Sequence, residues 1–288
     1  MRTAHPVMRF CAAVLALVGL PLGAGAQSCD KPVFMTFDTG HMGVAPLIAD
    51  TLKRFDARAT FFLANEPTLT EGRTLDEHWA PWWRARAAEG HDFGSHTWDH
   101  DTWLEDLPDG RFKVRTGAGV QPPKVREVSG SDYCESLKRV AQRFKVMTGQ
   151  TMGPIFRAPA GKTSPALLAL AKSCGFNHVG WSAAGFLGDE LSSQRFPNAQ
   201  LLERALRDIK PGDILMAHLG IWSRQDAWAP AVLEPLMQGL KARGMCFAPL
   251  REHPRYAAFF AAERALAQVL PFKATPTALA VNSEHKKP

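Results

Sequence analysis

Two histidines separated by three residues, His96 and His100, form a pair whose type and spacing allow metal chemistry. On a helical turn, side chains at positions i and i+4 project from the same side, so both imidazoles can reach one ion. By spacing alone, two unrelated core or surface histidines are the more frequent explanation. Thr97 occupies the position at which the HExxH motif of zinc proteases has glutamate, so the sequence disfavours that class of enzyme.

Three other chemically capable side chains each follow a short apolar run: Asp38, Arg157 and His218. A carboxylate can accept a proton as a general base, an arginine can orient that carboxylate, and a histidine titrates near neutrality and can donate a proton. Pro159 and Gly161 shape a turn whose backbone N–H groups can stabilise an oxyanion. Each residue also has an ordinary alternative, as a helix cap, a surface arginine or a hydrogen-bonded core histidine.

The elements that must position these residues are short apolar runs that alternate with helical periodicity. Strands are expected over 33–37, 59–63, 92–94, 154–156, 178–181, 214–217 and 245–250. Helices are expected over 44–55, 79–88, 131–147, 164–174, 199–209, 228–242 and 256–269, with Ser131 as the N-cap of the third. About seven strand–helix units predict an α/β fold, in which a parallel sheet closes into a distorted (β/α) barrel.

Active sites of such barrels lie at the carboxyl ends of the strands. Asp38, Arg157, His218 and the turn that begins at His96 all follow expected strands. Four polar residues that converge on one face of a barrel indicate an enzyme, because a structural protein has no reason to place them there.

The composition of the chain bounds its class and its compartment. The 288 residues, 45% of them hydrophobic, suffice for one large domain or two small ones. The net charge is +6 and the basic residues are scattered, so nucleic acid is a disfavoured partner. We expect a signal peptide over 1–26, because Arg2 and Arg9 are followed by an apolar run too short to span a bilayer and by a small-residue cleavage site at 24–26. Export to the periplasm or the exterior follows, with no membrane span in the mature chain.

Four cysteines remain after the expected cleavage, in an oxidising compartment. They allow three connectivities. We favour Cys134–Cys174, because both residues lie on expected helices that flank successive strands. Cys29–Cys246 would then tie the first strand to the last, and four unpaired buried cysteines are the alternative.

The catalytic domain is expected to cover 27–270. Residues 104–130 hold three prolines, four glycines and many charges without a clear period, which predicts an inserted surface loop or a hairpin. Residues 271–288 are expected to form a disordered tail.

Taken together and in order, these segments resemble the polysaccharide deacetylase family, also known as the NodB-homology domain or carbohydrate esterase family 4. The resemblance spans about 31–250, and its specificity lies in the ordered set, since no single motif is specific. The matching segments are Thr36–Gly40, His96–His100, Arg157–Gly161, the stretch around Trp181, and Leu215–His218, with connecting segments at Ala59–Phe62 and Glu89–His96.

The resemblance implies a NodB-like barrel and a divalent metal, most often zinc, bound by His96 and His100. It implies that Asp38 is the general base and His218 the general acid, and that Arg157 keeps Asp38 ionised and oriented. An amide has a poor leaving group, so such a reaction needs both an acid and an electrophile.

The resemblance also assigns substrate contacts. The backbone N–H of Ala160 would hold the oxyanion together with the metal. Trp181 and Met216 would line the pocket for the acetyl methyl group, and Leu215 is the alternative match to the leucine of the family's last motif.

Three departures from the family pattern matter. Thr39 stands where the family usually has a second aspartate that completes the metal's ligands, so the ion would rest on two histidines and water, or recruit Thr39 or His41. The family's aspartates near the Trp181 segment are absent, and Asp189 either replaces them from a displaced loop or is a solvated carboxylate. Ala160 replaces a residue that is often aromatic, which implies a wider cleft.

Three functions remain open on this reading. The first is N-deacetylation of an amino-sugar polysaccharide of the cell wall or an exopolysaccharide. The second is an O-acetyl esterase acting on a polysaccharide, and the third is a catalytically impaired carbohydrate-binding protein, for which Thr39 is the best support. Retention of the histidine pair, Asp38, Arg157 and His218 favours an enzyme. The sequence identifies neither the polymer nor the oligomeric state.

Overall fold

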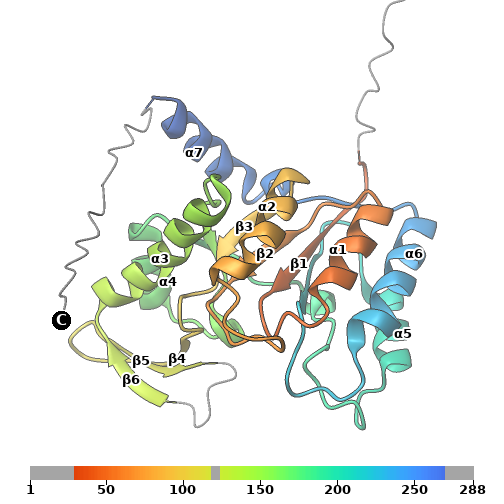
Figure 1. The fold of residues 1–288 in the computed structure, drawn as a ribbon, viewed down its shortest axis with the longest axis horizontal. Coiled ribbons are helices and arrows are strands. Elements are labelled where there is room, and N and C mark those ends of the chain that lie inside the picture. Colours follow the sequence, from red (N-terminus) through yellow and green to blue (C-terminus); the bar gives the residue numbers. More distant parts are fainter. Residues whose placement is uncertain (1–28, 118–123, 270–288) are drawn as a thin grey trace, which may run out of the picture.

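The computed structural model describes residues 29–117 and 124–269 (Figure 1). Its centre is a sheet of seven parallel strands in the order β10-β1-β2-β3-β7-β8, with β9 also paired with β1. The sheet confirms the expected distorted parallel barrel. The strands are β1 (Pro32–Asp38), β2 (Thr60–Leu63), β3 (Asp92–Ser95), β7 (Ile155–Phe156), β8 (Asn177–His178), β9 (Ile214–His218) and β10 (Cys246–Phe247).

Helices connect the strands and cover the sheet, and α2 packs on α3 and α5 on α6 (Figure 1). The helices are α1 (Ala45–Arg54), α2 (Ala80–Ala88), α3 (Gly130–Thr148), α4 (Pro165–Ser173), α5 (Asn198–Asp208), α6 (Glu234–Ala242) and α7 (Ala257–Val269). A π-helical segment, Ala229–Leu233, runs directly into α6, so the two together fill most of the expected helix over 228–242.

The cap of α3 differs from the expectation. Ser129, not Ser131, is the N-cap, because its backbone is extended and its hydroxyl accepts the Asp132 N–H, while the Asp132 carboxylate accepts the Ser129 N–H. This reciprocal capping box places Ser131 inside the first turn. Ser164 caps α4, at the start of the helix expected over 164–174.

Side chains alternate between the two faces of the paired strands β1 and β9. Met35, Phe37 and Leu215 belong to the main hydrophobic core. The pairing register sets Asp38 opposite His218, at the carboxyl ends of the two strands. This register brings a carboxylate and an imidazole that are 180 positions apart in the chain to neighbouring places.

The insertion expected over 104–130 has more regular structure than the surface loop or hairpin that the sequence predicted. It forms an antiparallel three-stranded sheet of β4 (Thr102–Asp106), β5 (Phe112–Thr116) and β6 (Lys124–Val128), as Figure 1 shows. Phe112, Val114 and Val128 pack in one cluster with Tyr133 and Leu137 of α3. The apolar–polar alternation of β5, with Lys113 between two buried residues, was the signal for a strand.

Both expected disulfides are present, with Cα–Cα distances of 6.0 Å for Cys29–Cys246 and 5.7 Å for Cys134–Cys174. The expected signal peptide and the expected tail over 271–288 lie outside the described residues. Within the described part of the chain, none of the helices combines the length and the apolar character that a bilayer span requires.

Candidate active site

Asp38 and Arg157 form a buried ion pair at the carboxyl ends of β1 and β7. Arg157 Nη1 donates to Asp38 Oδ1 at 2.8 Å, and its other nitrogens donate to the carbonyls of Val179 and Gly180. The guanidinium lies over the Phe62 ring, 4.3 Å from its centroid. Burial alone would raise the pKa of Asp38, but the Arg157 guanidinium, its hydrogen bond and the protonated His218 favour the charged form and the pKa is lowered, so the carboxylate is ionised at neutral pH.

His96 and His100 come together, but not on a helical turn as expected. The segment is a loop in which Thr97 and His100 have positive φ angles of 62° and 52°. The Thr97 hydroxyl accepts the backbone N–H of Asp101, which closes the loop, and the two imidazole centroids lie 4.8 Å apart. The spacing of the histidines therefore predicted their proximity, although the backbone that produces it is not helical.

The protonation of His96 is set by its neighbours. Burial lowers the pKa of His96 to about 4, so the ring is neutral. Its Nδ1 lies 2.8 Å from the backbone carbonyl of Arg157, which can only accept, so Nδ1 carries the proton and Nε2 has a free lone pair. That Nε2 is 3.7 Å from Asp38 Oδ2. Because His96 Nε2 and Asp38 Oδ2 both carry lone pairs and are both buried, a cation or the proton of a water molecule could bind between them.

The side chains that could bind a divalent cation here are the two imidazoles of His96 and His100. Burial lowers the pKa of His100 to about 4 as well, so both rings offer neutral nitrogen. The carbonyl partner of His96 Nδ1 is the kind of support that orients metal-binding histidines. Across residues 29–117 and 124–269, no group of three or more His, Cys, Asp or Glu side chains could hold a metal ion.

His218, at the end of β9, is paired with Asp189. The Asp189 carboxylate accepts the His218 backbone N–H at 2.7 Å and lies 3.1 Å from its Nδ1. Burial alone would lower the pKa of His218, but the negative charges of Asp189, Asp38 and Glu190, with Asp189 the largest contributor, outweigh burial and raise it to about 10. Asp189 is thus a partner of the expected general acid and not a solvated carboxylate, and His218 is protonated at neutral pH.

The expected substrate residues fall into two groups. Trp181 stacks near Phe186, with centroids 6.3 Å apart, and Phe186 pairs with Met216 through an isolated β-bridge. Leu215 lies in the main core, on the opposite face of β9 from Met216, because side chains alternate along a strand. The structure therefore does not bring Leu215 into the site.

Ala160 lies in the turn after β7, with a left-handed φ of 56°. The next residue, Gly161, has a φ of 65°, and a methyl group on it would lie 2.6 Å from the Trp181 indole. Glycine is required there by both its backbone and its neighbour. The turn thus holds Trp181 and the Ala160 backbone in one arrangement.

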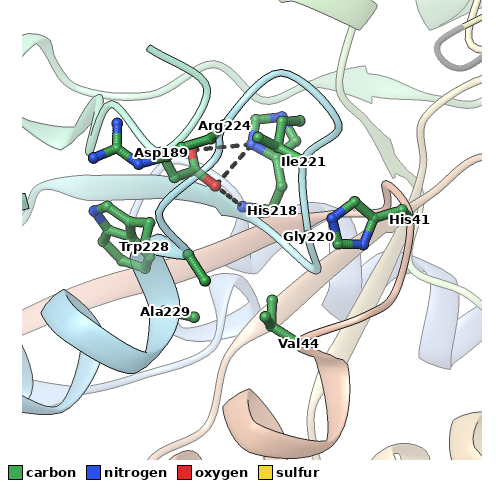
Figure 2. Close-up of a pocket in the computed structure, with 10 residues that line it drawn as sticks. His41, Val44, Asp189, His218, Gly220, Ile221, Arg224, Trp228 and Ala229 are labelled. Atoms are coloured by element: carbon green, nitrogen blue, oxygen red, sulfur yellow. Dashed lines mark hydrogen bonds and ion pairs between the residues drawn. The ribbon is translucent and has the colours of Figure 1, made fainter. Parts of the chain in front are cut away.

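Among the described residues, His41 does not form a metal-binding group with the histidine pair. Its Nδ1 accepts the Gly43 N–H, so the neutral ring carries its proton on Nε2 and has no lone pair there for a metal. The ring packs against Trp222, with centroids 5.1 Å apart. His41 and His218 both line a cavity of about 60 Å³, which Figure 2 shows with Asp189 beside His218. The lining residues do not include Asp38, His96 or His100.

Sequence reasoning missed one buried carboxylate. Glu66, three residues after β2, accepts a hydrogen bond from the Thr39 hydroxyl at 2.5 Å. Burial raises the pKa of Glu66, while the Thr39 bond and His96 lower it in part. The signal that could have found it is its position shortly after a buried strand, near the carboxyl end where Asp38 also lies on its own strand.

Comparison with known proteins decides the family. The family model described as polysaccharide deacetylase matches residues 25–179, more than half of the chain. The chain belongs to the polysaccharide deacetylase family. The family predicted from the motifs is therefore confirmed, and the class of enzyme is that of several relatives that are named as deacetylases.

Two relatives and one solved structure illustrate the range of the family. The chain is 28% identical to a chitooligosaccharide deacetylase of Azorhizobium caulinodans, over 76% of this chain and 92% of that protein. It is 24% identical to the peptidoglycan-N-acetylmuramic acid deacetylase PdaA of Bacillus subtilis, over 76% and 69%. A carbohydrate esterase family 4 pseudoenzyme of Bacillus anthracis shares the fold with a TM-score of 0.56 at 19% identity, over 77% of this chain and 65% of that one.

The Asp38–Arg157 pair supports a stability prediction for this deacetylase-family protein. Arg157→Met leaves the Asp38 carboxylate buried without its partner, so the free energy of unfolding should fall by about 3–5 kcal/mol. Urea denaturation at neutral pH measures the loss. The double variant Arg157→Met/Asp38→Asn should recover part of it, because no unpaired charge is then buried. A single variant that unfolds within 1 kcal/mol of the wild type would contradict the prediction.

Proposed function

We propose that this protein is a metal-dependent deacetylase that removes N-acetyl groups from an amino-sugar polysaccharide. The observation that carries the proposal is the pairing of an ionised carboxylate with a protonated imidazole. Asp38 and His218 stand opposite each other on neighbouring strands, and each has its own charged partner. Two neutral imidazoles, His96 and His100, lie beside Asp38.

The protein's own residues would divide the acid–base work. Asp38 would accept the proton of the attacking water, and Arg157 keeps it ionised and oriented for that step. His218 would donate a proton to the departing amine, for which Asp189 keeps it charged. A divalent cation held by His96 and His100 would polarise the acetyl carbonyl and lower the pKa of water. Zinc suits neutral imidazole ligands.

The substrate contacts follow from the same frame. The backbone N–H of Ala160, in its left-handed turn, would donate to the oxyanion. Trp181 and Met216, linked through Phe186, would line the acetyl-methyl pocket. Ala160 presents no aromatic ring at the rim, which supports access by a polymer chain.

The substrate class rests on the relatives, which are named for chitooligosaccharide and for peptidoglycan. Two disulfides support export to an oxidising compartment, where both kinds of glycan occur. The test measures acetate release from chitin oligomers, peptidoglycan and acetylated xylan, with and without a chelator. Release from the first two that a chelator stops supports the proposal. Release from xylan alone identifies an O-acetyl esterase, and glycan binding without any release identifies an impaired binding protein.

The Asp189–His218 pair makes a pH prediction. Asp189→Asn removes the largest of the charges that raise the pKa of His218, while Asp38 and Glu190 remain, so that pKa should fall from about 10 towards 6.5. A general acid works below its pKa, so the alkaline limb of kcat/KM should move to lower pH by more than one unit. Profiles of wild type and variant measure this shift. Asp208→Asn is the control that should leave the limb in place, because the Asp208 carboxylate is solvent-accessible and forms its ion pair with Arg207. An alkaline limb that is unchanged in Asp189→Asn would refute the role of Asp189 in keeping His218 protonated.

A further inference from the structure

The buried charges around the site do not balance. Asp38 is paired with Arg157, and Asp189 with His218. Glu66 is buried, and among the described residues no arginine, lysine or histidine forms an ion pair with it. An unpaired buried carboxylate is costly, so a cation close to Glu66 would stabilise its charged form.

Glu66 lies between the strands that carry the other site residues. Strand β2 stands between β1 and β3, and its last carbonyls accept the backbone N–H groups of Thr39 and His96 at 3.0 and 2.7 Å. The next residue but one, Asn65, donates its N–H to the carbonyl of Trp98 within the histidine loop at 2.8 Å. Glu66 therefore lies close to the point where the end of β1 and the loop that holds His96 and His100 are both hydrogen-bonded to β2.

The backbone of Glu66 is held in place. Its N–H donates to the Thr74 hydroxyl, and its carbonyl accepts the Thr74 N–H at 2.9 Å. A carboxylate with a fixed backbone and a bond to Thr39 has one orientation. It is thus a preorganised part of the site and not a surface group that has folded inward.

The bonds of Thr39 define what its hydroxyl can still do. A hydroxyl has one proton and two lone pairs. The proton goes to Glu66, and one lone pair accepts the Ala64 N–H at 3.0 Å. One lone pair remains, and donation to a carboxylate makes the oxygen more electron-rich.

We propose that Thr39 and Glu66 together replace the aspartate that the motif lacks at the metal site. Thr39 supplies the oxygen from the position of the missing ligand, and Glu66 supplies the negative charge by holding the hydroxyl proton. The proposal rests on the metal site of the proposed function. It treats Glu66 as a positioning residue that acts through Thr39.

The test measures Zn²⁺ affinity of the full chain by chelator competition, with no activity assay. Glu66→Gln keeps the shape but loses the charge, and it should weaken Zn²⁺ binding about 10–100-fold, as loss of other outer partners does. Thr39→Asp/Glu66→Gln moves the carboxylate to position 39 and should restore affinity. Thr39→Asp alone places two carboxylates together and should lower thermal stability without metal. Asp92→Asn, which removes a buried carboxylate bonded to Arg251, is the matched control and should bind like the wild type.

The outcomes separate this inference from the proposed function. If wild type binds Zn²⁺ through His96 and Glu66→Gln binds equally well, the Thr39–Glu66 role is overturned while the deacetylase proposal stands. If Glu66→Gln is weaker but the double variant is no better, the replacement of the aspartate is overturned. If the wild type binds no Zn²⁺, both the metal site and this inference fail.

Discussion

Asp38→Asn is expected to lower kcat for acetate release by about 10²–10⁴-fold, the contribution typical of a general base. The amide is nearly isosteric with the carboxylate but cannot accept a proton from water. Zn²⁺ content should stay near that of the wild type, because the two imidazoles, His96 and His100, remain in place. Measurement of kcat on the best glycan substrate and of bound Zn²⁺ in the same preparation checks both parts.

The control for this variant must allow for lost stability, since Asp38→Asn leaves Arg157 buried with no counter-charge. Asp92→Asn is a suitable control, because it also removes a buried carboxylate. Asp92 is buried and ion-paired with Arg251, but it begins β3, at the opposite end of the strand from the site. Both variants should lose stability, and only Asp38→Asn should lose turnover. Full turnover in Asp38→Asn, or an equal loss in both, means that the assigned base is wrong.

His96→Ala is expected to remove both Zn²⁺ binding and turnover. Loss of a partner that merely supports a ligand weakens metal binding 10–100-fold, so loss of one of only two imidazoles should exceed about 100-fold. The neutral ring and the lone pair on Nε2 are the physical reason. Chelator competition measures the affinity, and acetate release measures the turnover.

His91→Gln is the matched control for His96→Ala. His91 is another buried histidine, and burial lowers its pKa to about 4, but its Nδ1 accepts the Ala59 N–H at the amino side of β3. This variant should keep Zn²⁺ affinity. If His96→Ala binds Zn²⁺ as tightly as the wild type does, the two-imidazole site does not exist.

The chain's local patterns predicted the strands, and with them the places of the main site residues. Asp38 and His218 end buried strands whose apolar runs are visible in the sequence, and parallel strands bring such ends to one edge. The cysteine pairs followed from the same order of elements. The least accurate expectations were at element ends, as with Ser131, because reciprocal side-chain bonds choose among several suitable capping residues.

By itself, then, the sequence determined the barrel, the ordered motifs and the residues at the strand ends, since hydrophobic periodicity and strand order are local properties. Tertiary structure alone decided the partners. Asp189 reaches His218 from a loop, and Glu66 reaches Thr39 from the segment after the neighbouring strand. It also made the histidine loop non-helical and set Leu215 facing the core. The reason is that the partner of a buried charge is the group that lies near it in the folded chain. Spacing along the sequence does not determine that distance.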